Sequence, residues 1–143
     1  MAVTAKLYSN FFKTMANKEI DLDTDVIKVA LATSTYTPSQ TAHDYFNDIT
    51  NEVTGTGYTA GGATLASKTV GVSSLVFTFD AADTSWTTST LTARYAIVYD
   101  SSPGTAATNP LICYVDFGAD VISSGGTFSI TWDSLGILTL TAA

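Results

Sequence analysis

The sequence predicts a mainly β fold, an antiparallel β-sandwich of jelly-roll-like or immunoglobulin-like type with one short N-terminal amphipathic helix. Apolar and polar residues alternate in most segments after residue 26, which is the period of a half-buried strand. Thr, Ser, Asn and Gly separate these segments and favour turns. Hydrophobic residues make up 45% of the 143 residues, enough for one core, so we expect a single domain over residues 1–143.

The N-terminal segment predicts the helix. Over residues 5–16, apolar side chains recur at the spacing that places them on one stripe of a helix. Thr4 can serve as its N-cap. We expect this helix, within residues 1–17, to cover one end of the β core or to dock on a neighbouring subunit. The stripe consists of Leu7, Tyr8, Phe11, Phe12 and Met15.

The rest of the chain, residues 26–143, predicts a β core of roughly seven to nine strands. Residues 26–33 are apolar on both faces apart from Lys28, which indicates a central strand. Weaker strands are expected at 58–60 and 63–72. The clearest alternation, each expected to give one continuous apolar face, runs through Leu75, Phe77 and Phe79; Leu91, Ala93, Tyr95, Ile97 and Tyr99; Leu111, Cys113, Val115 and Phe117; Phe128, Ile130 and Trp132; and Leu138 and Leu140.

Three stretches are expected to be loops, because polar residues, Gly and Pro interrupt the alternation. The longest, residues 34–56, is polar and contains Pro38. Long loops in compact domains are usually functional or are ordered by a partner. Residues 101–110 and 119–126 are expected to be shorter connections.

The charge distribution disfavours nucleic acid as a partner. The net charge is −7, and from residue 29 onward Lys68 and Arg94 are the only cations. Such a body cannot build a phosphate-neutralising face. Charged residues make up only 13% of the chain, which suits a surface covered by partners. We find no signal peptide and no apolar run of about 18 residues, so we expect a protein made in the cytoplasm with no membrane partner.

The ionisable residues predict no enzyme. His43 and Cys113 are the only residues of their kinds. Cys113 alternates with apolar residues, so we expect a buried, inert thiol rather than the nucleophile of a Cys–His pair. Tyr58 and Trp86 could form a sugar-stacking platform, or they could cap the edge of the core.

Two further patterns resemble ligand sites without matching them. Asp21, Asp23 and Asp25 could attract calcium, but Gly and Glu are missing from the required EF-hand positions, so we favour a solvated acidic connection. The glycines of residues 55–62 resemble a phosphate loop, yet no Lys-Ser/Thr pair follows them. A hairpin turn at Gly61 and Gly62 is simpler. We therefore expect no catalytic residue, no cofactor and no metal ligand.

Residues 27–70, IKVALATSTYTPSQTAHDYFNDITNEVTGTGYTAGGATLASKTV, resemble a family of small virion structural proteins from tailed bacteriophages. Members of that family also begin with a short helix and continue with a VKVAL-type strand, a TYTP segment, an HDYF/ND segment and a GYTAGGATL hairpin. The later segments ARYAIVYD and FSITWDSLGILTL are similar in style but less distinctive.

The resemblance implies a virion part without catalytic residues. We expect a capsid decoration, or cement, protein on the outer surface of the capsid, bound to the major capsid protein and to copies of itself as a homotrimer. A tail component and a glycan-binding module of a fibre or adhesin are the alternatives. The residues predicted to contact partners are Leu7, Tyr8, Phe11, Phe12, Tyr36, Tyr45, Phe46 and Tyr58.

Overall fold

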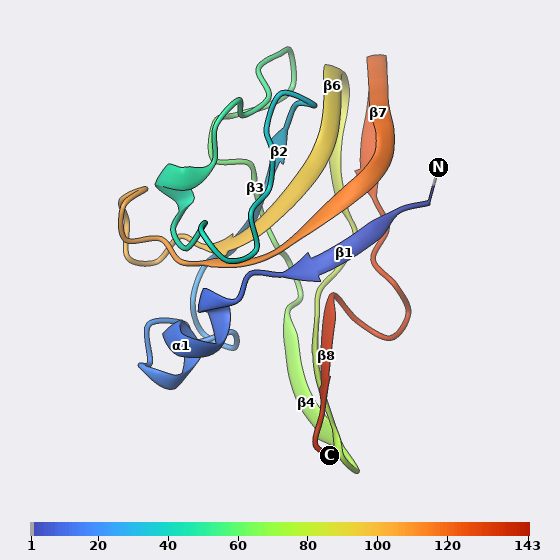
Figure 1. Cartoon of the computed structure of the whole chain (residues 1–143). Helices are drawn as coiled ribbons and strands as arrows, with labels where there is room; N and C mark the ends of the chain where they lie inside the picture. The colour runs from blue at the N-terminus through green and yellow to red at the C-terminus, as the bar shows by residue number, and fades with distance from the viewer. Residues whose placement is uncertain (1) are drawn as a thin grey trace.

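The computed structural model of the chain describes residues 2–143, which form two antiparallel sheets and one α-helix (Figure 1). The larger sheet has five strands in the order β1-β7-β6-β2-β3, and the smaller sheet has three in the order β4-β5-β8. The predicted mainly β, sandwich-like fold is confirmed. The elements are β1 Thr4–Leu7, α1 Asn10–Ala16, β2 Ile27–Ala32, the 3-10 turn η1 Phe46–Asp48, β3 Ala63–Thr64, β4 Thr69–Ser73, β5 Val76–Asp80, β6 Thr84–Asp100, β7 Leu111–Ile130 and β8 Leu138–Thr141.

The predicted N-terminal helix is shorter than expected, because its first part is a strand. β1 pairs with the edge of β7, and α1 begins only at Asn10, so Thr4 is not its N-cap. A short isolated helix is marginal in water, whereas the edge of β7 offers backbone hydrogen bonds to an extended segment. Among the described helices, none is long and apolar enough to cross a membrane.

The long hairpin of β6 and β7 is the centre of the larger sheet. It pairs continuously from Thr84 opposite Ile130 to Tyr99 opposite Leu111, with several register shifts. The loop predicted at residues 119–126 is wrong, because these residues lie inside β7. Gly125 accepts a positive φ of 64° where the register shifts, so it bends the strand instead of ending it.

Two irregularities also change which residues share a face. The register shifts between Ala93 and Tyr95, so Leu91 and Ala93 lie in one core cluster whereas Tyr95 packs against the other. A second shift places Leu111 and Cys113 in different clusters. The two continuous apolar faces predicted for these strands are therefore wrong, because each bulge adds one residue to the period of two.

Both faces of the larger sheet are covered. The smaller sheet and α1 cover one face, where Phe11, Phe79 and Leu138 join the main core cluster. The predicted loop 34–56 covers the opposite face, where Tyr36, Phe46 and Ile49 pack with the second cluster. This double cover explains why β2 is apolar on both faces, as predicted for residues 26–33.

The smaller sheet extends beyond the body of the molecule (Figure 1). We call residues 69–80 and 138–141 the arm. Its root packs on the body through Phe79 and Leu138, which are buried. Its tip holds Val72 and Leu75, which are 73% and 63% exposed. The arm is therefore anchored at one end and free at the other.

Candidate interaction surface

The residues predicted to contact partners differ widely in exposure. Three of them are core residues, because Tyr8, Phe11 and Tyr36 have exposed fractions of 0–1%. Phe12 is 49% exposed and offers the largest apolar surface of the set. The half-buried members are Leu7, Tyr45, Phe46 and Tyr58.

A chain of buried polar groups fixes the 34–56 segment against the sheet. The hydroxyls of Tyr8 and Tyr36 lie 2.9 Å apart, and the Tyr36 hydroxyl lies 2.9 Å from His43 Nδ1. The backbone N–H of Ser39 donates to the same His43 nitrogen over 3.3 Å. Burial raises the pKa of Tyr36 to about 12 and that of Tyr8 further, so both phenols are protonated at neutral pH. These contacts give His43 a structural role.

Cys113 and His43 lie on opposite sides of the larger sheet. Cys113 belongs to the core cluster on the arm side, whereas His43 contacts Tyr36 of the other cluster. Burial raises the pKa of the Cys113 thiol to about 12, which keeps it protonated. The prediction of a buried cysteine is confirmed, and the two side chains form no nucleophile–base pair.

Trp86 is buried, and the half-buried Tyr58 packs beside it. Trp86 is only 6% exposed, and its ring centroid lies 5.9 Å from that of Tyr58. The Tyr58 hydroxyl donates to Glu52 over 2.7 Å and accepts the backbone N–H of Leu31 over 3.0 Å. These rings cap the edge of the core, and Trp86 offers no exposed face for stacking a sugar.

The glycine-rich segment is shaped by close packing against β2. Gly62 has a φ of +78°, and a Cβ at this position would lie 2.0 Å from the Val29 carbonyl oxygen. The backbone N–H of Gly61 donates to Glu52 over 2.6 Å. A turn forms here, but the predicted hairpin is wrong, because residues 58–60 form no strand before it.

The side chain of Lys68 binds the backbone of the acidic segment before β2, residues 21–25. Lys68 Nζ donates to the backbone carbonyls of Leu22 over 3.3 Å, of Asp23 over 3.1 Å, and of Asp25. Hydrogen bonds from Thr24 and from the Asp23 backbone lower the pKa of Asp21. Within residues 2–143, no three His, Cys, Asp or Glu side chains are placed to hold a metal ion.

The arm has one apolar face that continues outward from the core. The pairings Val72 with Phe77 and Phe77 with Leu140 place these side chains on one face, because alternate residues of a strand point the same way. On this face Val72 is 73% exposed and Val70 is 39% exposed, whereas Phe79 and Leu138 are buried. The full set is Val70, Val72, Phe77, Phe79, Leu138 and Leu140.

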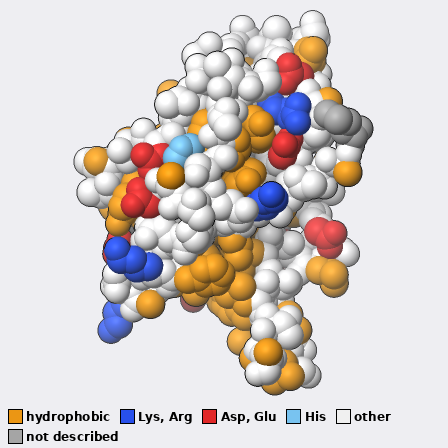
Figure 2. Space-filling model, viewed as in Figure 1, with side chains coloured by type: hydrophobic (Ala, Val, Ile, Leu, Met, Phe, Trp, Pro, Cys, Tyr) orange, Lys and Arg blue, Asp and Glu red, His pale blue; other side chains and the backbone are white. Residues whose placement is uncertain are grey.

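A groove runs between the arm and the segment around α1. Its volume is about 380 Å³, and apolar side chains of Met15, Ile20, Val70 and Phe77 line it. Figure 2 shows hydrophobic side chains gathered at the junction of the body and the arm. We call the groove lined by these residues the α1–arm groove. Its charged lining residues are Lys18, Asp21 and Asp23, all exposed.

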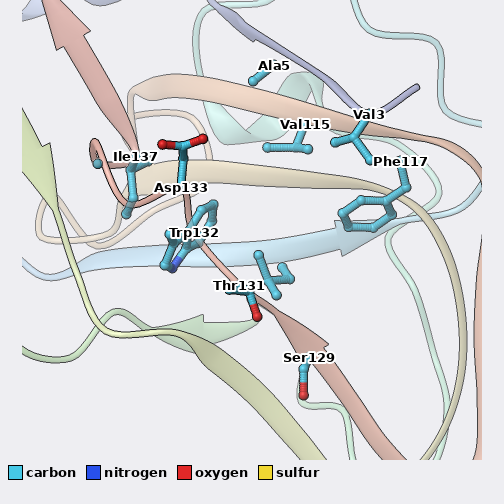
Figure 3. A pocket seen from close by; sticks show the side chains of 11 residues that line it. Val3, Ala5, Val115, Phe117, Ser129, Thr131, Trp132, Asp133 and Ile137 are labelled. Atoms are coloured by element: carbon cyan, nitrogen blue, oxygen red, sulfur yellow. The ribbon is translucent and has the colours of Figure 1, made fainter.

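A larger hollow of about 530 Å³ lies between β1, β7 and the loop before β8 (Figure 3). Val3, Val115 and Phe117 gather at one end of it, and Trp132 lies nearer the other (Figure 3). Asp133 is the one ionisable side chain among its described lining residues. A single carboxyl group provides no acid–base pair, and most of the lining side chains are apolar.

Other ionisable side chains also hold structure together. Arg94 Nε lies 2.5 Å from the Asp116 carboxylate, which lowers the pKa of Asp116. The Tyr45 hydroxyl donates to Glu19 over 2.9 Å and connects the 34–56 segment to the residues that follow α1.

No protein-family model, curated protein or solved structure matches the chain.

Proposed function

We propose that this chain is a non-enzymatic structural protein of a tailed-bacteriophage virion, acting as a decoration protein on the outer capsid surface. The observation that carries the proposal is the arm, whose tip exposes the apolar residues Val72 and Leu75 in the single chain. Exposed apolar surface of this kind marks a site of protein association. The resemblance of residues 27–70 to virion structural proteins supplies the context.

The composition of the surface supports a role in association. A decoration protein binds an assembled shell and repeats at every equivalent site. Its contacts must release water from its surface, which costs least where long charged side chains are few. Residues 69–79 and 134–143 contain no Lys, Arg, His, Asp or Glu. The partners we propose are the major capsid protein and other copies of the chain, with a homotrimer as the repeating unit.

Separating virions into heads and tails tests this role. We expect the chain to co-purify with heads and to be identified there by mass spectrometry after extensive washing. Recovery from tails alone would replace the decoration role with that of a tail component. Absence from both fractions would overturn the proposal of a virion protein.

A further inference from the structure

We propose that the carboxylates of Asp25 and Asp100 together bind a calcium ion, at the point where the acidic segment before β2 meets the end of β6. This inference stands apart from the proposed virion role, because the site lies within one chain. The two carboxylates supply the charged ligands, and water supplies neutral oxygens.

The two carboxyl groups are neighbours at the end of the β2–β6 pairing. Ile27 pairs with Asp100, so Asp25, two residues earlier, is the diagonal neighbour of Asp100 on the same face. The Ser101 N–H donates to the Val26 carbonyl over 2.9 Å, which continues the pairing toward Asp25. Burial raises the pKa of Asp100, and the neighbouring Asp25 carboxyl raises it further, so the two groups are in electrostatic contact.

Asp100 has one carboxylate oxygen that lacks a partner. The residue is fully buried, with an exposed fraction of 0%, and its Oδ1 accepts the backbone N–H of Ser102 over 2.8 Å. Its Oδ2 has no hydrogen-bond partner within residues 2–143. A buried carboxylate is costly unless it is hydrogen-bonded, protonated or paired with a cation. Since Ser102 occupies Oδ1, Oδ2 is the oxygen left for a ligand shared with Asp25.

No cationic side chain of the described chain neutralises this pair. Within residues 2–143, the one ion pair joins Arg94 to Asp116. The Lys68 ammonium contacts backbone carbonyls of the acidic segment, including that of Asp25, instead of a carboxylate. Two neighbouring carboxylates without a cationic side chain form a negative site that a small cation can neutralise.

Calcium suits this set of ligands. Ca²⁺ accepts about six to eight oxygen ligands in flexible geometry, from carboxylates, carbonyls and water. Asp25 is half-buried, so water can reach the site and complete the shell. Mg²⁺ demands near-ideal octahedral geometry, which ligands from two separate segments fit less readily. Two charged ligands predict weak binding, with a Kd on the order of 10⁻⁴ to 10⁻³ M.

The proposed site uses different carboxylates from those that the acidic sequence pattern suggests. Asp21 Oδ1 accepts the backbone N–H groups of Asp23 and Thr24 over 3.0 and 3.2 Å, so it is occupied within its own turn. Asp25 Oδ2 accepts the Asp21 N–H over 2.7 Å, which leaves its second oxygen for the ion. Asp100 is distant in sequence, and the pairing of β2 with β6 brings it to Asp25.

Calcium titration of the full chain tests the site. A bound ion needs both carboxyl groups ionised, so the titration is made at about pH 8 after treatment with a chelator. Calorimetry should show one Ca²⁺ bound per chain. In about 10 mM Ca²⁺ the unfolding temperature should rise by about 3 °C or more. Sodium chloride at the same ionic strength gives the baseline, because it screens the net charge of −7 without filling the site.

Asparagine variants identify the ligands. Asp25→Asn and Asp100→Asn each remove one charged ligand and preserve the shape of the side chain, so each should weaken calcium binding at least about tenfold. Asp23→Asn is the matched control, because it removes the same charge from an exposed side chain of the same segment and should bind calcium like the native chain. A circular dichroism spectrum like that of the native chain shows that each variant is folded, and either ligand variant suffices for the comparison.

Three results would overturn the inference: no calcium-dependent heat in the native chain, a temperature rise of the same size in sodium chloride, or an equal response in all three asparagine variants. An equal response would mean that calcium acts on the net charge and not at Asp25 and Asp100. A crystal structure with calcium should show the ion in contact with both carboxylates, and an ion bound only elsewhere would also overturn the assignment. None of these results depends on whether the chain is found on heads.

Discussion

At the residue scale, several polar and ionisable side chains hold the structure together. The Tyr36 hydroxyl links Tyr8 to His43 in a chain of contacts of 2.9 Å each. The Lys68 ammonium is bound by backbone carbonyls, and Glu52 accepts from both Tyr58 and Gly61. Each group holds a connecting segment in place, in a chain that has one cysteine and therefore no internal disulfide.

Gly62 gives the first residue-scale prediction. Gly62→Ala should lower the free energy of unfolding by about 3 kcal/mol or more, because the new Cβ would meet the Val29 carbonyl and the positive φ disfavours a side chain. Gly71→Ala is the matched control, since no atom lies within 4 Å of its Cβ position. Urea denaturation of both variants measures the difference. Equal stabilities would show that the turn does not approach β2 as described.

Asp100 gives the second residue-scale prediction. Burial raises the pKa of Asp100 to about 7, and the neighbouring Asp25 carboxyl acts in the same direction. An unfolded Asp titrates near about 3.9, so only the folded state holds this proton between about pH 4 and about pH 7. The contribution of Asp100 to stability should therefore be greatest below about pH 4 and fall as the pH rises toward 7.

Replacing this carboxyl with an amide removes its titration. Asp100→Asn should abolish this part of the pH dependence and raise the free energy of unfolding above pH 7 by about 1–3 kcal/mol relative to the native chain. Urea denaturation at several pH values measures the slope, with Asp120→Asn as the exposed control. An unchanged slope in Asp100→Asn would contradict the assignment.

At the element scale, the strands were predictable wherever an unbroken period of two ran through them. β2, β5 and β8 correspond closely to predicted segments, because their apolar residues alternate or are buried on both faces. The alternation could not reveal the bulges of β6 and β7, since an inserted residue changes the face of its neighbours without changing composition. It could not reveal β1 either, since Thr4–Leu7 forms a strand only where β7 offers an edge.

The exposed face of the arm was beyond prediction for a related reason. Alternation at residues 75–79 and 138–140 indicates an apolar face but does not say what covers it. In the structure, the body covers Phe79 and Leu138 at the root and leaves Val72 at the tip exposed. Of the residues predicted to contact partners, Tyr8, Phe11 and Tyr36 are buried in the core, because they pack against the larger sheet of the same chain.

The contact of Lys68 with the backbone of residues 21–25 gives an element-scale prediction. Lys68→Met should lower the free energy of unfolding by about 1–3 kcal/mol, since three backbone carbonyls lose a charged donor. Lys13→Met is the matched control, because Lys13 is exposed on α1 and should change stability little. Thermal unfolding of the two variants compares them. A loss of the same size in Lys13→Met would point to net charge instead of the carbonyl contacts.

At the scale of the whole molecule, the closely packed body and the exposed apolar tip of the arm are different parts of the chain. The larger sheet is covered on both faces and carries the buried polar contacts, whereas the arm presents uncharged apolar surface away from the body. A chain arranged in this way is suited to fill the space between neighbouring subunits, with the body as a fixed support. The proposed decoration role uses both properties, because cement must be stiff and must bind on more than one side.

The mainly apolar character of the arm predicts how attachment responds to salt. Contacts without charge pairs are screened little, so raising the ionic strength should leave the amount of chain bound to heads nearly unchanged. Binding that depended on phosphate or on surface ion pairs would fall steeply instead. Quantifying the chain retained on washed heads across a salt series distinguishes the two. Release by moderate salt would contradict an apolar contact.

Heat resistance of heads with and without this chain tests the central claim most directly. Heads lacking it should release their DNA at a lower temperature than complete heads, and adding back the purified native chain should restore the difference. Adding back Val72→Lys should restore less, because it places a charge on the exposed apolar tip of the arm. Heads that lack the chain and still withstand heat as well as complete heads would contradict the decoration role.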